Sequence, residues 1–169
     1  MHDYYVKSYE LPGRKVYAAV QEERVISLSL SPLRDAYLDG LVKKAPRDMF
    51  SPGCGGLEKA LRRFFAGRDP VFDCGIRLYG TAFDHAVWKA CMAIPYGETR
   101  SYGELAAAAG NPRAARAAGN ALSRNPLLLI VPCHRVIAGD GSPGGFGGGR
   151  SFGGHRLKLE LLDLEKGGP

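Results

Sequence analysis

The sequence lacks the patterns of a metal site, an exported protein or a membrane protein. It has four cysteines and four histidines, but no C-x-x-C pair and no histidines at ligand spacing. We therefore expect no metal site. The first residues have neither a basic n-region nor an apolar h-region, and no apolar run is long enough to span a membrane. We expect a reducing, cytoplasmic compartment. A disulfide between Cys54 and Cys74 stays open as an alternative.

Length and charge bound the kind of protein and its partner. A chain of 169 residues can bury one good core or two small ones. The formal net charge is +6 and the sequence pI is about 9.3. Such a charge favours an acidic partner, although many proteins are mildly basic for no such reason.

The N-terminal half has the pattern of a small scaffold domain. Residues 14–20 and 24–30 are predicted to be two strands joined by a short loop at 21–23, and the second of them alternates clearly. A helix is predicted over 31–44, a loop over 51–56 and a second helix over 57–65. No chemical motif occurs in this half. We place a domain boundary after Leu78, so that residues 1–78 form the scaffold and residues 79–169 a second domain.

The second domain begins with helices arranged as a helix-turn-helix. Thr81 caps a helix with an apolar stripe that includes Cys91, which we therefore interpret as structural. A short helix then runs from Tyr102 to Ala109 and is closed by Gly110.

The next helix is predicted from Asn111 to Arg124 and combines small residues with a polar face. Its small residues, Ala117, Gly119 and Ala121, suit close approach to a duplex groove. The polar face carries Arg113, Arg116, Asn120 and Ser123. The alternative is an alanine-rich surface helix with solvated arginines.

The segment Pro132-Cys133-His134-Arg135 carries the clearest chemistry. The apolar run 127–131 before it is predicted to be a buried strand, which Pro132 ends. A thiol beside an imidazole can be deprotonated and used as a nucleophile. Neighbouring side chains on a strand point to opposite faces, so the pair needs a backbone turn or a bridging water. The alternative is that Cys133 is a small buried hydrophobe.

Residues 139–154 are glycine-rich and predict a flexible loop before the last helix, 154–166. That helix buries Leu157, Leu161 and Leu164. Glu165 follows Leu161 and Leu162 by four and three residues, so it faces the core, where a carboxylate needs a partner such as an imidazole. The alternative is that Glu165 is solvated at the helix end.

From the residues alone, three functions remain open. They are a cysteine enzyme that attacks an acyl or alkyl centre, such as a hydrolase, a non-catalytic helix-turn-helix DNA-binding protein, and a peroxidase-like redox protein. The redox function needs a resolving cysteine, and Cys91 is predicted to be buried. DNA binding alone explains Arg113 and Arg116 but not the Cys133–His134 pair.

The order and spacing of several motifs resemble the methylated-DNA–protein-cysteine methyltransferases, or O6-alkylguanine-DNA alkyltransferases. The resemblance extends from about Gly80 to Glu165. The matching segments are Tyr96-Gly97-Glu98-Thr99-Arg100-Ser101-Tyr102, Ala109-Gly110-Asn111-Pro112-Arg113-Ala114-Ala115-Arg116, Asn125-Pro126 and Ile130-Val131-Pro132-Cys133-His134-Arg135-Val136-Ile137.

The resemblance implies a mechanism in which the damaged nucleotide is flipped out of the duplex. Cys133 takes the alkyl group of O6-alkylguanine, and of O4-alkylthymine, irreversibly and once. His134 acts as base through a water, and Glu165 orients it. Tyr102 helps to rotate the target phosphate and donates to the departing guanine. Asn125 ties the preceding segment to the active-site turn.

The resemblance also implies how the duplex is held. Arg116 fills the gap left by the flipped base. Further DNA contacts fall on the same helix and beside the thiol, at Arg113, Gly119, Asn120, Ser123 and Arg135.

Other expectations concern the fold and the partner. The fold class is α+β, with a small RNase H-like N-terminal domain and a winged-helix-like C-terminal domain. The partner is double-stranded DNA, the protein acts as a monomer, and no cofactor is needed. The chain departs from the family pattern in a longer glycine-rich loop around residues 149–153, and in Phe146, where relatives often have tyrosine.

Overall fold

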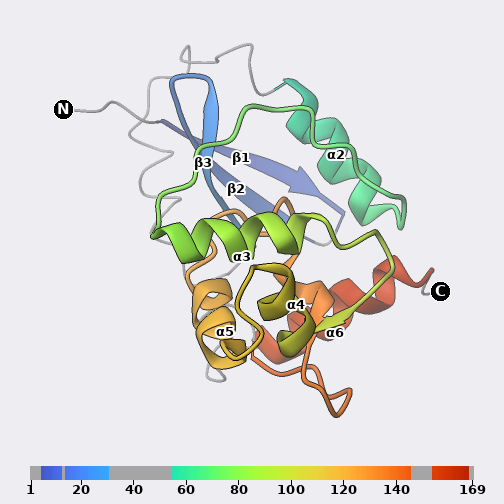
Figure 1. The fold of residues 1–169 in the computed structure, drawn as a ribbon. Helices are drawn as coiled ribbons and strands as arrows, with labels where there is room; N and C mark the ends of the chain where they lie inside the picture. Colours follow the sequence, from blue (N-terminus) through green and yellow to red (C-terminus); the bar gives the residue numbers. More distant parts are fainter. Residues whose placement is uncertain (1–4, 13, 31–54, 146–153, 168–169) are drawn as a thin grey trace. The chain divides into compact units, whose positions relative to one another are not determined.

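The computed structural model describes residues 5–12, 14–30, 55–145 and 154–167. Contacts divide the chain into two compact units, residues 1–78 with 126–128 and residues 79–125 with 129–169 (Figure 1). The predicted helix over 31–44, Cys54, and the loop residues Phe146 and 149–153 lie outside the described part. Within the described part, no helix has both the length and the apolar character needed to cross a membrane.

The first unit contains an antiparallel sheet in the order β1 (Tyr5–Leu11), β2 (Arg14–Gln21) and β3 (Arg24–Ser29). The predicted strands 14–20 and 24–30 are confirmed to within a residue, whereas β1 was not predicted. Glu22 and Glu23 both have positive φ angles, 47° and 62°, as a two-residue hairpin turn requires. The sheet core includes Val16, Tyr17 and Val20 of the central strand.

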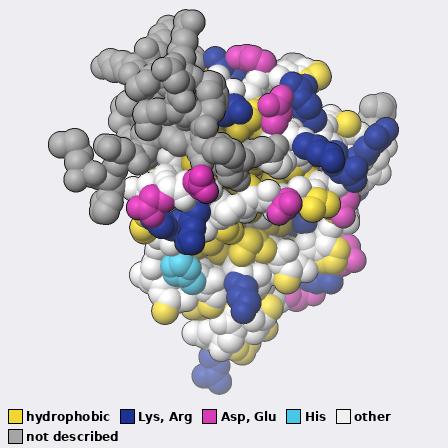
Figure 2. Space-filling view, turned by 90° about the horizontal axis from the view of Figure 1, so that it is seen from above, with side chains coloured by type: hydrophobic (Ala, Val, Ile, Leu, Met, Phe, Trp, Pro, Cys, Tyr) yellow, Lys and Arg dark blue, Asp and Glu magenta, His cyan; other side chains and the backbone are white. Residues whose placement is uncertain are grey.

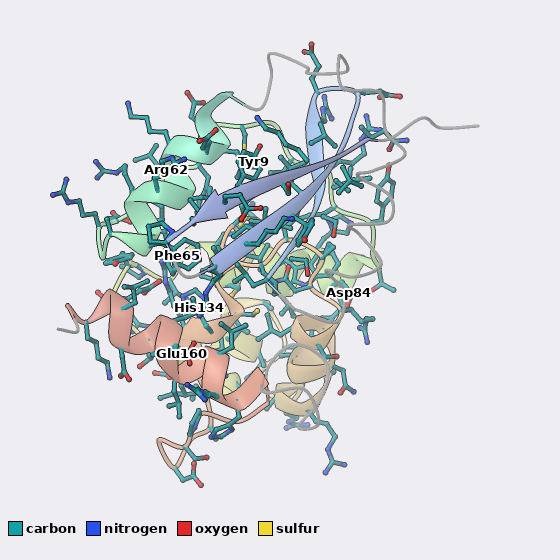
Figure 3. The ribbon with its side chains drawn as sticks, turned by 180° about the vertical axis from the view of Figure 1, so that it is seen from behind. Tyr9, Arg62, Phe65, Asp84, His134 and Glu160 are labelled. Carbon is teal, nitrogen blue, oxygen red and sulfur yellow. The ribbon has the colours of Figure 1, made fainter. Side chains whose placement is uncertain are left out.

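Helix α2 (Gly55–Phe65) completes the described part of the first unit. It begins two residues before the predicted helix 57–65 and buries the stripe Leu57, Ala60, Leu61 and Phe64 at helical spacing. Its outer face carries Arg62 (Figure 3), which donates to Glu58 one turn earlier at 3.1 and 2.9 Å.

The second unit is mostly helical, and its first helix forms as the sequence predicts. Thr81 caps α3 (Ala82–Met92) in a capping box with Asp84, so that each side chain accepts the other's backbone N–H. Val87, Trp88 and Cys91 are buried. The prediction that Cys91 belongs to the buried stripe is confirmed.

The helix-turn-helix consists of α4 (Tyr102–Ala108) and α5 (Ala115–Ser123). Ser101 caps α4, and Gly110 follows it with a φ of 87°. The predicted start of α5 at Asn111 is wrong: residues 111–114 form a turn in which Ala114 N–H donates to Asn111 O at 3.0 Å. This i to i+3 bond makes a tight turn, so α-helical bonding begins only at Ala115.

Three further elements lie near the Cys133 segment in the second unit. The short strands β4 (Arg100–Ser101) and β5 (Val136–Ile137) pair in parallel. Helix α6 (Gly154–Glu165) is the predicted last helix. Its buried side chains are Lys158, Leu161, Leu162 and Glu165, whereas Leu157 and Leu164 are only half-buried.

The predicted strand over 127–131 is wrong. Leu28 N–H donates to Pro126 O at 2.7 Å and Leu28 O accepts from Leu128 at 3.2 Å, but Leu129 then turns with a φ of 71°. Residues 126–128 belong to the first unit, and the chain returns to the second unit at Leu129. An apolar run indicates burial, and all of this run but Leu128 is buried, yet only its first residues pair with β3 and no continuous strand forms.

Gly80 offers a test of how tightly α3 packs. A Cβ on Gly80 would lie 2.7 Å from the Trp88 ring, whereas a Cβ on Gly139 has nothing within 4 Å. We expect Gly80→Ala to destabilise the protein by about 1–3 kcal/mol through overpacking, and Gly139→Ala to leave stability nearly unchanged. Urea unfolding of both variants checks this. Equal stability of the two variants would show that the indole moves aside freely.

Candidate active site

The Cys133 thiol lies on a tight turn rather than at a strand end. Residues Cys133–Arg135 form a 3₁₀ turn, in which Arg135 N–H donates to Pro132 O at 2.9 Å. The turn supplies the backbone change that cooperation between Cys133 and His134 requires. Both side chains are buried: Cys133 is 5% exposed and His134 is 0% exposed.

Asn125 contacts the sulfur directly. Its Nδ2 donates to Val131 O at 2.9 Å and to Cys133 Sγ at 3.3 Å. The side chain is buried and lies directly after Arg124, the residue that caps α5. The structure therefore brings Asn125 together with the active-site turn, where the resemblance placed it.

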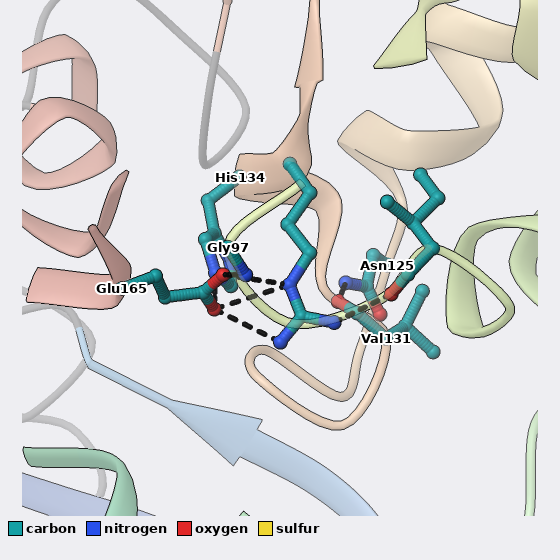
Figure 4. A network of polar contacts seen from close by, with 7 residues as sticks. Gly97, Asn125, Val131, His134 and Glu165 are labelled. Carbon is teal, nitrogen blue, oxygen red and sulfur yellow. Dashed lines mark hydrogen bonds and ion pairs between the residues drawn. The ribbon is translucent and has the colours of Figure 1, made fainter. Parts of the chain in front are cut away.

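Glu165 is the centre of a network of polar contacts (Figure 4). Its Oε1 accepts from His134 Nε2 at 2.7 Å, and its Oε2 accepts from Gly97 N–H at 2.9 Å. Arg135 adds three bonds, from Nε at 3.1 and 2.9 Å and from Nη2 at 2.9 Å. The Glu165 side chain is 1% exposed, so the alternative of a solvated helix end is wrong.

These contacts fix the charge of Glu165. Burial alone raises the pKa of a carboxyl group, but the hydrogen bonds from His134 and Arg135 outweigh it. The pKa of Glu165 is therefore lowered to about 2. The carboxylate is ionised at neutral pH and can only accept hydrogen bonds.

His134 is neutral at the same pH. Burial lowers the pKa of its imidazole below the ordinary value of 6.5, although the bond to Glu165 acts in the opposite direction. Because Glu165 can only accept, Nε2 of His134 carries the proton. The lone pair of the neutral ring is then on Nδ1, which leaves the imidazole able to accept a proton there.

The structure does not support the predicted DNA contact of Arg135. Its side chain is buried, and besides the bonds to Glu165 its Nη1 donates to Ile94 O at 2.7 Å. The guanidinium also lies 5.5 Å from the centre of the Tyr96 ring. The DNA contact was implied by the resemblance, whereas in the structure the guanidinium pairs with the buried carboxylate of Glu165.

Lys158 is a site residue that the sequence reasoning missed. It is fully buried on α6, and its Nζ donates to Val136 O and, at 3.3 Å, to Gly145 O. The same Nζ lies 5.6 Å from the centre of the Tyr102 ring. Lys158 precedes Glu165 by two helical turns, so the spacing that placed Glu165 toward the core applied to Lys158 as well.

The charges around Cys133 leave it a thiol at neutral pH. Burial raises the pKa of Cys133, and the hydrogen bond from Asn125 and the charge of Lys158 offset this only in part. Burial likewise lowers the pKa of Lys158 to about 8. Lys158 thus stays mostly protonated at pH 7, whereas Cys133 must transfer its proton before it can act as a nucleophile.

Tyr102 and Gly119 lie together on the other side of the site. The Tyr102 hydroxyl donates to Gly145 O at 3.3 Å, and a Cβ on Gly119 would lie 3.5 Å from the Tyr102 ring. Burial raises the pKa of Tyr102, so its hydroxyl keeps its proton. Gly119 thus packs against Tyr102, and Ala121 is fully buried. The prediction that Gly119 and Ala121 face a duplex groove is wrong for Ala121.

The predicted polar face of the helix is exposed. Its members are Arg113, Arg116, Asn120 and Ser123. Ser123 Oγ donates to the backbone carbonyl of Asn120 at 2.7 Å in the last turn of α5. Among the residues that the structure describes, no group of three or more histidine, cysteine, aspartate or glutamate side chains is placed to hold a metal ion.

A buried thiol, followed in the sequence by a neutral imidazole that a carboxylate orients, is the set of groups found in proteins that use a cysteine as a nucleophile. Comparison with known protein families shows which family of proteins this chain belongs to. The sequence model of the 6-O-methylguanine DNA methyltransferase, DNA binding domain, matches residues 82–167. The chain belongs to this family.

Individual relatives with similar sequences support this family membership. A methylated-DNA–protein-cysteine methyltransferase of Mycobacterium leprae is 53% identical over 106 residues, which are 63% of this chain and 61% of that protein. The constitutive enzyme of that name from Bacillus subtilis is 34% identical over 163 residues, 96% of this chain and 95% of that protein. The structure of Mycobacterium tuberculosis OGT in complex with DNA has a TM-score of 0.76 and 37% identity, covering 98% of this chain and 95% of that one. The mixed α/β fold, a small sheet with helices, therefore matches that of a family member.

The Glu165 network generates a prediction about stability and pH. The pKa of Glu165 is about 2 in the folded protein against an ordinary 4.5. Its stabilising effect is therefore present above pH 4.5 and is lost as the pH falls toward 2. We expect Glu165→Gln to cost about 3–5 kcal/mol at pH 7, because Arg135 is left buried without its partner. That cost should shrink below about pH 4.5.

Urea unfolding at several pH values measures this cost. Glu160→Gln is the matched control, since Glu160 lies on the same helix and accepts from Arg156 at an exposed position. We expect only a small, nearly pH-independent effect there. A cost of Glu165→Gln that stays constant from pH 7 to about pH 3 would contradict the ionised network.

Proposed function

We propose that this chain repairs alkylated DNA by moving the alkyl group of O6-alkylguanine, and of O4-alkylthymine, onto Sγ of Cys133. The observation that carries the proposal is the contact of His134 with the ionised Glu165, one residue after a buried thiol, in a member of the methyltransferase family. The substrate is double-stranded DNA, from which the damaged nucleotide is flipped into the site.

The proton of the thiol leaves first. It passes through a bridging water to the lone pair on Nδ1 of His134, and Glu165 stabilises the imidazolium that forms. The thiolate sulfur then attacks the alkyl carbon. One carbon–sulfur bond forms as the carbon–oxygen bond breaks, and the electron pair of that bond stays on the guanine.

The departing guanine then needs a proton or a positive charge. Tyr102 keeps its hydroxyl proton, and we infer that it donates a hydrogen bond to the leaving base. Lys158 lies beside the Tyr102 ring and mostly carries a positive charge at pH 7, since its pKa is about 8. We infer that this charge stabilises both the thiolate and the anion that develops on the base.

The exposed face of α5 supplies the contacts with the duplex. Arg116 fills the space left by the flipped base, and Arg113, Asn120 and Ser123 contact the backbone near it. Basic and acidic side chains are interspersed over the described part of the face in Figure 2. The described part of that face therefore has no patch of a single charge sign. We infer that duplex binding rests on α5, with a salt dependence set by its phosphate contacts.

The finer architecture is part of the proposal. We infer an RNase H-like scaffold over residues 1–78 and a winged-helix-like domain over 79–169 that binds DNA and carries out the transfer. The antiparallel sheet with α2 supports the first, and the α4–α5 pair with strands β4 and β5 supports the second. A reactive thiol of this kind needs a reducing compartment, which favours the cytoplasm.

The transfer happens once per molecule. An ordinary covalent intermediate is released by hydrolysis, but a thioether on Cys133 has no carbonyl for water to attack and no good leaving group. His134 can move a proton, but it cannot make the carbon–sulfur bond labile. The alkylated protein is therefore the end product.

Intact-mass measurement after mixing with duplex DNA that contains O6-methylguanine tests the proposal. We expect one added methyl group per molecule, on Cys133, even when the DNA is in large excess. Cys133→Ser should gain no methyl group yet still bind the lesion, because a hydroxyl preserves the shape but is a poor nucleophile. Methylation of the serine variant, or more than one methyl group removed per molecule, would refute the assignment.

Arg116→Ala separates base flipping from chemistry. Its proposed role is to hold the flipped state, which the free base O6-methylguanine does not need. We expect slower transfer from duplex DNA by roughly tenfold or more, with little change for the free base. Arg156→Ala, an exposed arginine on α6, is the control and should change neither rate. Equal losses with both substrates would instead place Arg116 in the pocket.

A further inference from the structure

Two side chains of α3 contact the end of α5 immediately before Asn125. Asp84 Oδ1 accepts from Arg124 Nη2 at 2.5 Å, and Trp88 Nε1 donates to Ala121 O at 3.0 Å. Asp84 and Trp88 are four residues apart, so they lie on the same face of α3.

The Asp84 carboxylate is held in place by Thr81 as well as by Arg124. Its Oδ2 accepts from the backbone N–H of Thr81 at 3.0 Å and from the Thr81 hydroxyl at 2.8 Å. Its side chain is 4% exposed, and the bond to Arg124 helps to hold its pKa below the ordinary value. The Asp84 carboxylate is therefore a rigid, charged anchor, whereas the Arg124 side chain is 56% exposed.

The Asp84–Arg124 ion pair lies at the end of α5, next to the point at which the chain leaves the second unit. Arg124 caps α5, and its N–H donates to Ala121 O and Leu122 O. Asn125 N–H donates to Leu122 O at 3.1 Å. Asn125 is the last residue of the second unit before the chain enters the first unit at Pro126. Arg124 and Asn125 are adjacent in the chain, so an ion pair that holds Arg124 also restrains the backbone from which the Asn125 side chain reaches Val131 O and Cys133 Sγ.

We propose that Asp84 and Arg124 are positioning residues for the nucleophile. Their ion pair holds the C-terminal end of α5 so that Asn125 Nδ2 keeps its hydrogen bonds to Val131 O and Cys133 Sγ. The reactivity of the thiol thereby depends on α3, although α3 contributes no group to the chemistry. This inference rests on the proposed function only where it concerns DNA repair. The hydrogen bond from Asn125 to the sulfur does not itself involve DNA.

The test uses iodoacetamide as a small thiol reagent, without DNA, so that a contact of Arg124 with phosphates plays no part. Modification of Cys133 is followed by peptide mass mapping, which distinguishes it from the other cysteines. We expect Arg124→Met to slow the modification by roughly threefold to tenfold, the effect of weakening one hydrogen bond to the sulfur. Arg124→Lys, which keeps the positive charge, should recover part of the rate.

A matched control and a double variant separate positioning from general loosening. Arg156→Met removes another arginine from an ion pair with a carboxylate, at 2.9 Å on α6, and should leave the rate unchanged. In an Asn125→Ala background, Arg124→Met should have no further effect, because its influence passes through Asn125. An undiminished effect in that background, or no effect in the natural protein, would overturn the proposal. Neither result bears on whether Cys133 accepts alkyl groups, which the methyl transfer assay decides separately.

Discussion

The pairing of Arg135 with Glu165 is the constraint on which the site depends. A buried carboxylate next to a lone imidazole would tend to draw a proton onto the ring. Here the guanidinium matches the carboxylate's charge, and the charge of Arg135 also helps to lower the pKa of His134. Glu165 can therefore orient the imidazole without protonating it. Buried ion pairs are weak evidence for stability, and this one is better explained by the neutral base that it preserves.

Burial of Cys133 imposes opposing demands. A buried thiol with a raised pKa is protected from unwanted reaction, but it must lose its proton when a substrate arrives. Asn125 and Lys158 act against burial and lower the pKa of the thiol, and in the proposed reaction His134 receives its proton. Because these groups come from the end of α5, the 3₁₀ turn and α6, the thiol is activated only where the three segments meet. In the proposed single transfer, such restraint keeps the nucleophile for the intended reaction.

Sequence patterns predicted the structure correctly where the helical repeat determines which side chains face the core. The capped α3, the inward direction of Glu165 and the exposed face of α5 followed from helical spacing, and the structure has all three. Lys158 shared the spacing of Glu165 but was overlooked because lysine is rarely buried. The run 127–131 was buried as expected, yet apolarity does not specify a backbone conformation. The inward turn of Arg135 depended on a partner thirty residues away, which no local pattern reveals.

The chain leaves the second unit for residues 126–128, a few residues before Cys133, and hydrogen bonds hold it on both sides of this excursion. Asn125 and Leu129 are the points at which the chain leaves and rejoins the second unit, and Cys133 follows soon after. The bond from Asn125 Nδ2 to Val131 O closes the excursion, while the bonds of Leu28 to Pro126 and Leu128 hold its middle. Asn125 Nδ2 also donates to Cys133 Sγ, so one side chain joins the end of α5 to both the returning chain and the sulfur. The last turn of α5 therefore takes part in setting the geometry at Sγ.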